Sequence, residues 1–391
     1  MLNYLNLFKK FFTKKWYFSC EKNIDLILLD NNFEKLKFKN LKYLNHNNKL
    51  YIFEFLTSLF KYILKLKFTK VKFVDYYFKN LIIKLNPKVA LGHDIDEVIF
   101  KFKKFFPEKI SIMYQKGYIF DHEKISIRKF KKLFPRKDMT EAIAYQMGYI
   151  FNQNFDSNSK KKFKKKEVDY YMVFDQRSVK LMSKHIKAKY LIAGSIKSNE
   201  SNLEKKNKKY DLMFCSPYRK YNNKHFEKNT NHDRFAVKMI KKYCKKNKKK
   251  ICIAFASRRE DKIKYHFYNE ELLFYEKNLS DFHNPDIDAR QLASMSNVII
   301  STISNLGYEL FLSGKKVFFY NKKNYKYNFF KNKNSLVSYS GNSYKIFEKK
   351  LNYLLGINEK KYLVFYRKKM KDKYYDKGNN KLKKLIYKIT K

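Results

Sequence analysis

Short runs of apolar residues recur along the whole chain, with amphipathic stretches between them. The runs are continuous rather than alternating, which is typical of parallel strands that helices cover on both faces. Glycine and proline, with 9 and 5 residues, are too scarce for a turn-dense all-β architecture. The sequence therefore predicts a doubly wound α/β fold, with strands at residues 26–29, 89–91, 110–114, 170–174, 190–193, 212–215, 251–256, 298–301 and 317–320.

The length of 391 residues predicts two domains, because a single domain usually holds about 100 to 200 residues. A polar stretch at 199–210 divides the strands into two sets and is typical of a linker. We therefore expect five segments: a basic amphipathic N-terminal segment (1–21), a Rossmann-like domain (22–198), the linker (199–210), a second Rossmann-like domain (211–355), and a basic helical tail (356–391) with the apolar spacing to pack back across the first domain.

The formal net charge is +52, but only nine of the 88 basic residues are arginine. The abundant lysine, asparagine, isoleucine, phenylalanine and tyrosine share A/T-rich codons, so a genome bias explains the charge more simply than nucleic-acid binding does. Nucleic-acid-binding proteins generally rely on arginine for bidentate contacts. A positive surface still attracts anionic membranes and phosphorylated ligands. A lysine-rich nucleic-acid-binding protein remains an alternative at this point.

The cysteines and the hydropathy pattern indicate a cytoplasmic protein. The four cysteines show neither a CxxC pair nor the spacing of a disulfide framework. No stretch reaches the roughly 18 apolar residues that a membrane span needs. The segment 1–21 either lies on the inner face of an anionic membrane or packs on the domain, through a stripe formed by Leu5, Phe8, Phe12 and Trp16. A second helical stripe is formed by Ile52, Leu56, Leu59, Phe60 and Ile63.

The stretch 297–320 holds the most informative pattern of the chain. It predicts a strand, a Ser/Thr-rich turn, a helix that begins near Ser304 or Asn305, and a second strand. The amide groups of the helix start, with the hydroxyls of Ser301, Thr302 and Ser304, suit a phosphate-sized anion. Glu309, in the early helix, either accepts hydrogen bonds from a ribose diol or only complements the helix dipole.

This stretch resembles the donor-side motif of bacterial surface carbohydrate biosynthesis transferases, found in capsule and O-antigen (lipopolysaccharide) gene sets. The likeness lies in Leu-Gly-Tyr-Glu at 306–309 and Gly-Lys-Lys-Val at 314–317, although Ser304–Asn305 replaces the usual Ser-Thr and Asn297 the usual Asp. Further segments that resemble the family are 86–96, 114–117, 193–199, 214–219 and 257–275. The resemblance implies a GT-B-like glycosyltransferase, with two doubly wound Rossmann-like domains that face a central cleft.

The resemblance also implies roles for individual residues. A nucleotide-sugar donor is expected on the second domain and a glycan or lipid-linked acceptor on the first. The expected donor-binding residues are Arg258, Arg259, Ser301, Thr302, Ser304, Asn305, Gly307 and Glu309. The expected catalytic residues are Asp96, which matches the motif best, and His93, with Asp94 as a further candidate for the base. Capping of the next helix by Asp94 or Asp96 is the alternative.

We expect no metal, because the histidines lack metal-ligand spacing, and no cofactor besides the nucleotide sugar as substrate. Arginines and helix N-termini can neutralise a departing nucleotide without a metal. The sequence therefore favours a metal-independent glycosyltransferase. Two alternatives stay open: the nucleic-acid-binding protein, and a GT-B scaffold without catalytic activity.

Overall fold

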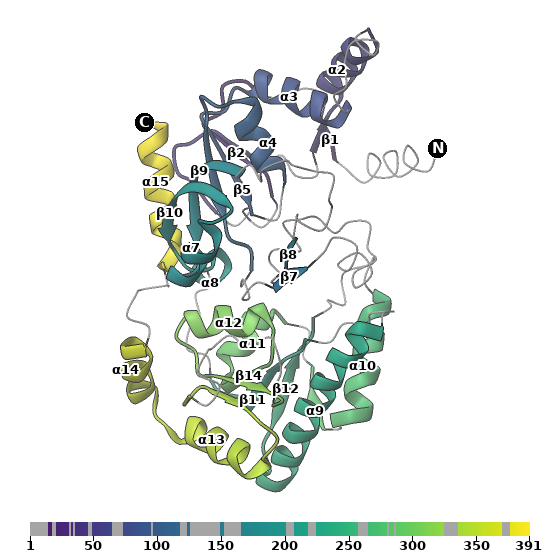
Figure 1. The fold of residues 1–391 in the computed structure, drawn as a ribbon, viewed down its shortest axis with the longest axis vertical. Coiled ribbons are helices and arrows are strands. Elements are labelled where there is room, and N and C mark those ends of the chain that lie inside the picture. Colours follow the sequence, from purple (N-terminus) through teal and green to yellow (C-terminus); the bar gives the residue numbers. More distant parts are fainter. Residues whose placement is uncertain are drawn as a thin grey trace. The chain divides into compact units, whose positions relative to one another are not determined.

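The computed structural model divides the chain into two compact units (Figure 1). The first draws its residues from 1–116, 161–193 and 379–391, and the second from 117–160 and 194–378. The residues that the structure describes are 15–17, 21–30, 33, 36–45, 49–64, 73–94, 97–117, 123–125, 149–151, 166–200, 207–217, 224–256, 265–279, 281–284, 287–323, 335–369 and 376–391.

The first unit contains a parallel sheet of six described strands. Their spatial order is β3-β2-β5-β6-β9-β10, which is the flavodoxin-like order 2-1-3-4-5 extended by one strand. The strand that follows β2 in the chain, β3, lies on one side of β2 in the sheet. The next strand, β5, lies on the other side of β2. The strands are β2 (Leu26–Leu28), β3 (Tyr43–Asn45), β5 (Val89–His93), β6 (Ile110–Tyr114), β9 (Lys166–Val173) and β10 (Ile186–Ile192).

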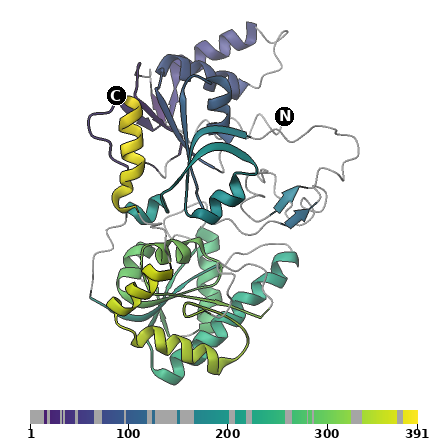
Figure 2. The same ribbon diagram turned by 60° about the vertical axis from the view of Figure 1, so that its left-hand side comes forward.

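Helices from both ends of the chain cover this sheet. The last helix, α15 (Asn380–Thr390), buries Leu382 and Ile386 and lies along the first unit's sheet (Figure 2). Lys88 Nζ, just before β5, donates to the Thr390 carbonyl at 2.8 Å. The other helices of this unit are α2 (Ile52–Leu64), α3 (Phe73–Leu85), α4 (Glu97–Phe105) and α7 (Gln176–Met182).

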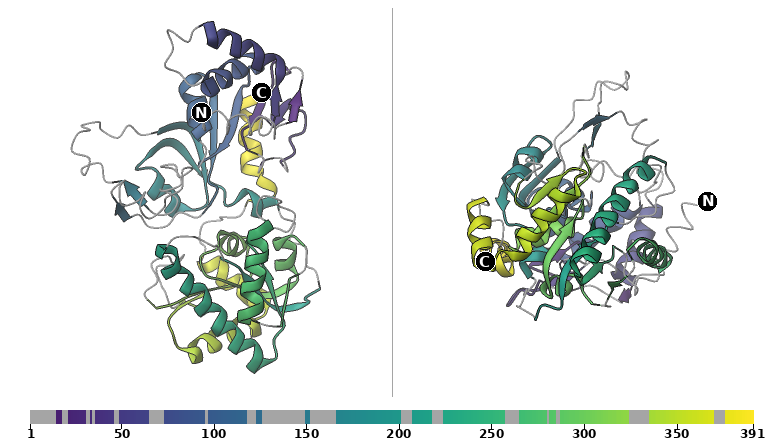
Figure 3. Two further views of the ribbon diagram at one scale, coloured as in Figure 1. Left: turned by 90° about the vertical axis from the view of Figure 1, so that its right-hand side faces the viewer. Right: turned by 90° about the horizontal axis from the view of Figure 1, so that it is seen from below.

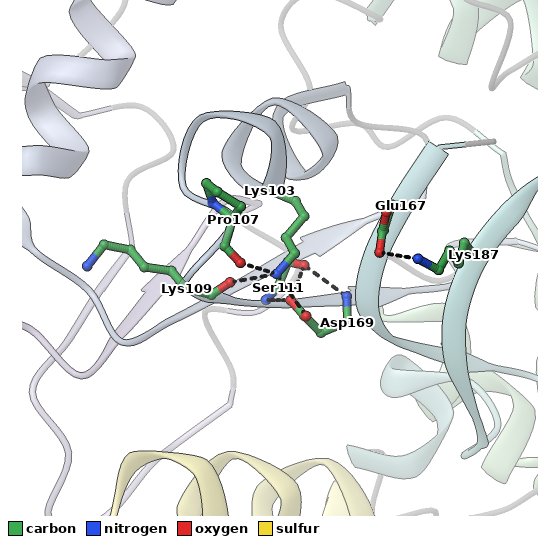
Figure 4. A network of polar contacts seen from close by, with 7 residues as sticks. All are labelled: Lys103, Pro107, Lys109, Ser111, Glu167, Asp169 and Lys187. Carbon is green, nitrogen blue, oxygen red and sulfur yellow. Dashed lines mark hydrogen bonds and ion pairs between the residues drawn. The ribbon is translucent and has the colours of Figure 1, made fainter. Parts of the chain in front are cut away.

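A polar network ties α4 to the strands beneath it (Figure 4). The Asp169 carboxylate, on β9, accepts from the backbone N–H and the hydroxyl of Ser111 on β6, both at 2.8 Å. Lys103 Nζ, on α4, donates to the same carboxylate at 2.8 Å and to the Pro107 carbonyl at 2.7 Å. The half-buried carboxylate thus has a cation and two donors, and it fixes one helix and two strands at once.

The second unit contains another parallel sheet of six described strands, in the order β13-β12-β11-β14-β15-β16. This is the Rossmann order 3-2-1-4-5-6, in which the chain grows from β11 to β13 and then restarts on the other side of β11 with β14. The strands are β11 (Tyr210–Cys215), β12 (Ile251–Ala254), β13 (Phe282–His283), β14 (Ser296–Ser301), β15 (Val317–Asn321) and β16 (Ser338–Ser340).

Helices lie on both faces of the second sheet (Figure 3). The core between them is rich in aromatic rings, among which Tyr320 and Phe347 lie 4.8 Å apart, centroid to centroid. These helices are α8 (Ile196–Glu200), α9 (Lys224–Asn247), α10 (Tyr265–Leu279), α11 (Ala289–Ser294), α12 (Asn305–Leu312), α13 (Tyr344–Gly356) and α14 (Glu359–Lys369). Two short strand pairs, β1 (Lys15–Tyr17) with β4 (Lys49–Tyr51) and β7 (Glu123–Ile125) with β8 (Tyr149–Phe151), complete the described strands.

The two doubly wound parallel sheets confirm the predicted fold class, and two such domains are the components of a GT-B-like fold. The contacts divide the chain differently from the predicted linker at 199–210, because α8 packs against α12 and belongs to the second unit. They also divide the tail: α14 stays with the second unit, where the Tyr362 hydroxyl donates to the Lys315 carbonyl at 2.8 Å, whereas α15 joins the first.

Candidate functional site

Each sheet has one position where the order of its strands reverses. In open α/β sheets, ligands bind outside the carboxyl ends of the strands at this topological switch point. In the second unit the switch point lies between β11 and β14, whose last residues are Cys215 and Ser301. In the first unit it lies between β2 and β5, which ends at His93. The topology therefore places predicted site residues of both units at ligand-binding positions.

At the switch point of the second unit, two buried hydroxyl groups stand without a partner. Ser301 Oγ and Thr302 Oγ1 are both inaccessible to solvent and have no hydrogen-bond partner in the part of the chain that the structure describes. A buried hydroxyl without a partner costs about 1–3 kcal/mol. Native proteins contain few such groups, and a functional role is one of the explanations for those that occur.

The helix α12 begins directly after these hydroxyls. Ser304 is its N-cap residue, but the Ser304 side chain makes no capping hydrogen bond. Asn305, the first helical residue, is exposed. The first amide groups of a helix carry a partial positive charge and have no partner within the helix. An anion at this end of α12 would meet those amides, and the two buried hydroxyls precede them directly in the chain.

Gly307 allows α12 to lie close against β14. A Cβ atom at this position would lie 2.2 Å from Ser301 Oγ and 2.3 Å from Ser301 Cβ. The predicted site glycine is itself buried, so its visible role is close packing of the helix start on the strand that carries Ser301.

Glu309 is buried and forms an ion pair with Arg290 of α11. The two side chains are 8 % and 19 % exposed, so water screens the pair only in part. The Arg290 backbone is fixed as well, because its N–H donates to the capping carboxylate of Asp288 at 2.8 Å. Neither of the two roles considered for Glu309 from the sequence, the ribose contact or the dipole partner, includes this pair.

Arg290 is a site residue that the sequence analysis missed. Its only sequence signal is its type, since arginine is rare in this chain and stands here just after a helix cap. Burial raises the pKa of the Cys215 thiol at the end of β11, and the charge of Arg290 acts in the opposite direction. Burial has the larger effect, and it favours the neutral thiol, as in structural rather than reactive cysteines.

A second polar cluster lies where β11 and β12 end. The fully buried Glu271 carboxylate, on α10, accepts from the Ser216 hydroxyl and from the backbone N–H of Ala256 at 3.0 Å. The Tyr275 hydroxyl donates to Ser216 Oγ at 2.7 Å. Glu271 thus holds the last described residue before 257–264, the stretch that contains Arg258 and Arg259. These two predicted phosphate-binding arginines lie outside the described residues.

In the first unit, His93 is buried and structurally fixed. Its ring stacks on Phe33 with centroids 4.5 Å apart, and Nδ1 lies 3.1 Å from the Tyr114 carbonyl oxygen. A carbonyl oxygen accepts only, so Nδ1 carries the proton. The imidazole is therefore held from two sides.

Asp94 is also buried, and two of its hydrogen bonds join it to other parts of the sheet. Its carboxylate accepts from the Lys116 backbone N–H at 3.1 Å and from the Tyr171 hydroxyl at 2.7 Å. Asp30, which follows β2 and was not predicted as a site residue, lies 3.6 Å from Lys116 Nζ. The switch point of the first unit thus joins two buried carboxylates through one lysine. Asp96, the preferred base, lies outside the described residues.

The described residues contain neither a metal-binding cluster nor a membrane-spanning helix. No group of three or more histidine, cysteine, aspartate or glutamate side chains could hold a metal ion there. Within the same residues, no helix is long and apolar enough to cross a membrane.

A profile of a family described as O-antigen biosynthesis proteins matches residues 146–390. This is more than half of the chain and includes β9, β10 and the whole candidate site around α12. The chain belongs to this family. The predicted family of bacterial surface carbohydrate biosynthesis proteins is thereby confirmed. As an O-antigen biosynthesis family member, the protein acts in surface glycan biosynthesis.

Comparisons with individual proteins give distant likenesses only. No curated protein sequence matches this family member. A UDP-GlcNAc 2-epimerase from Neisseria meningitidis is 10 % identical over 81 % of this chain and 79 % of its own, with a TM-score of 0.45. The pneumococcal O-GlcNAc transferase GtfA is 13 % identical over 81 % and 60 %, with a TM-score of 0.41. A UDP-N-acetylglucosamine 2-epimerase reaches a TM-score of 0.48 at 9 % identity, over 94 % and 95 %.

The packing of Gly307 can be tested by one methyl group. Gly307→Ala should destabilise the second unit by about 1–3 kcal/mol, because the new Cβ overlaps Ser301. Gly356→Ala is the matched control, since nothing lies within 4 Å of a Cβ there. It should be neutral or stabilise α13 by up to about 1 kcal/mol. Urea unfolding followed by circular dichroism measures both, and equal effects would contradict the close packing.

The ion pair of Arg290 and Glu309 can be tested by a double-mutant cycle. Glu309→Gln and Arg290→Gln should each lower the free energy of unfolding by about 1–3 kcal/mol, because each leaves a half-buried charge without its partner. The double variant should lose clearly less than the sum of the two. Additive losses in thermal or urea unfolding would mean that the pair contributes nothing to stability.

Proposed function

We propose that this O-antigen biosynthesis family member is a glycosyltransferase. It transfers a sugar from a nucleotide-sugar donor to a cell-surface polysaccharide or a lipid-linked glycan, on the cytoplasmic side of the membrane. The observation that carries the proposal is the pair of unpartnered buried hydroxyls of Ser301 and Thr302 at a topological switch point, directly before α12. Family membership supports the product class, a surface glycan.

The donor binds at the switch point of the second unit in this proposal. Its phosphates meet the amides of α12, the hydroxyls of Ser301 and Thr302, and the polar Ser304 and Asn305. The ion pair with Arg290 occupies one oxygen of the Glu309 carboxylate. In the proposal, the second oxygen accepts a hydrogen bond from a ribose hydroxyl. Gly307 contributes by keeping the helix start close to β14 rather than by touching the donor.

The reaction breaks the bond between the sugar C1 and the phosphate oxygen, and forms a bond between C1 and an acceptor hydroxyl oxygen. The leaving nucleotide needs its growing negative charge neutralised, and Arg258 and Arg259 supply positive charge without a metal. The acceptor proton passes to a base on the first unit. Asp96 is the better candidate, because the ring of His93 is enclosed between Phe33 and the Tyr114 carbonyl.

Thr302→Val tests the donor site, because its two effects have opposite signs. In the free protein the variant should be as stable as the wild type or more so, since it removes a buried hydroxyl without a partner. Nucleotide binding should weaken by about 10- to 150-fold, because a hydrogen bond to a charged group is worth about 1.5–3 kcal/mol. Thermal shift with UDP, GDP and CMP, in roughly 0.3 M salt to suppress non-specific polyanion binding, measures both effects.

The matched control is Thr390→Val on α15, which removes a hydroxyl that donates to the Ile386 carbonyl in the first unit. It should leave nucleotide affinity unchanged. If the wild type binds none of the nucleotides but retains RNA at the same salt, the protein is a nucleic-acid-binding protein instead. If nucleotides bind and Thr302→Val has wild-type affinity, the donor site lies elsewhere. If nucleotides bind but no sugar is transferred, the protein is a GT-B scaffold without catalytic activity.

Asp96→Asn tests the proposed base. The variant should keep nucleotide affinity and stability, because asparagine caps helices as well as aspartate does. Turnover should fall by about 10² to 10⁴, since an amide cannot accept the acceptor proton. The measurement is the rate of nucleotide release from a nucleotide sugar. Its nucleotide is the one that binds best in the thermal-shift comparison, and a lipid-linked glycan extract supplies the acceptor. A normal rate would exclude Asp96 as the base.

A further inference from the structure

The helix α2 of the first unit is amphipathic in the opposite sense to an ordinary surface helix. Its buried residues are polar, Glu54 and Ser58, whereas large apolar side chains face solvent. Figure 1 shows α2 beside α3, on the side of α3 away from the sheet. The apolar stripe predicted from the sequence therefore exists, but most of it does not face the core.

Polar and aromatic contacts hold α2 on α3. Glu54 forms an ion pair with Lys84, and Asn80 Nδ2 donates to Ser58 Oγ at 3.2 Å. The rings of Phe55 and Phe73 lie 5.4 Å apart, centroid to centroid. Among the solvent-facing apolar side chains, Phe53 lies beneath Lys84 Nζ, 4.7 Å from its ring centroid. The other four, Leu56, Phe60, Ile63 and Leu64, take no part in these contacts.

The exposed apolar residues form one continuous stripe along α2, which we call the α2 stripe. Spacings of three and four residues put them on one face of the helix. Scattered single apolar residues are normal on a protein surface, but a contiguous patch marks an interaction site. The α2 stripe consists of Phe53, Leu56, Phe60, Ile63 and Leu64, which are 53–66 % exposed.

The charge around the α2 stripe is positive. The residues that connect α2 to α3, 65–72, include four lysines and no acidic residue. Lys61, on α2, is exposed. The acidic residues of the two helices are neutralised, since Glu54 pairs with Lys84, and Asp75 accepts from Lys101 at 2.7 Å. An apolar face beside lysines without exposed acids suits a surface that is apolar inside and anionic outside.

We propose that the α2 stripe is the membrane-binding surface of this protein, on which the first unit lies against an anionic lipid bilayer. The apolar side chains enter the boundary between headgroups and acyl chains, and the exposed Lys61 contacts lipid phosphates. A second copy of the chain is the poorer occupant, because it would bring two lysine-rich segments together. The assignment is independent of which sugar or nucleotide the protein uses.

The test is flotation of the full chain with vesicles of phosphatidylcholine alone or with about 30 % phosphatidylglycerol, in about 0.1 M salt. The wild type should float with the anionic vesicles. The double variant Leu56→Gln/Phe60→Gln keeps every charge, and should lose at least about 10-fold in vesicle partitioning. Leu273→Gln is the control, because Leu273 is equally exposed but lies on α10 of the second unit. It should partition like the wild type.

Three results would overturn the proposal. The first is that the wild type does not float with the vesicles. The second is equal flotation of the wild type and the double variant, which would show that net charge alone causes the binding. The third is a concentration-dependent dimer, seen by sedimentation velocity, that the double variant abolishes without a change in flotation. Unchanged melting temperature of the double variant supports the proposal, because side chains that only face solvent in the fold contribute little to its stability.

Discussion

The close approach of α12 to β14 is the constraint on which the candidate site depends. Gly307 lies directly against the Ser301 side chain, so no side chain of its own separates the helix start from the strand end. The Ser301 hydroxyl lies against this glycine, and neither it nor the Thr302 hydroxyl is accessible to solvent. A larger residue at position 307 would lift the helix away and let water satisfy these hydroxyls. The close packing at the candidate site thus depends on the absence of a Cβ atom at position 307.

The fold was largely predictable from the sequence, because parallel strands buried on both faces leave continuous apolar runs such as 110–114 and 298–301. The order of the strands was not predictable in this way. The two sheets have different orders, 2-1-3-4-5-6 and 3-2-1-4-5-6, although the chain presents similar alternations of strands and helices in both halves. Only long-range pairing, such as β11 with β14, decides which order forms.

The candidate site was predictable where one local segment forms it and unpredictable where distant segments meet. The stretch 297–320 forms the expected strand, helix and strand, with the helix beginning at Asn305. Glu309 pairs with Arg290 and Asp94 with Tyr171, and both partners lie on other elements. No spacing in the sequence predicts these pairs. The α2 stripe shows the same limit, since periodicity identifies an apolar face but not the direction in which it points.

The return of α15 to the first unit affects the order in which the protein can fold during synthesis. Leu382 and Ile386 fill the core of the first unit, yet they leave the ribosome after every strand of the second unit. Domains usually complete their folding from the N-terminus onward. Here the second unit has all of its described elements before the first has its last helix. A nascent chain of this protein therefore exposes an unfinished apolar surface on its first unit until α15 has been translated.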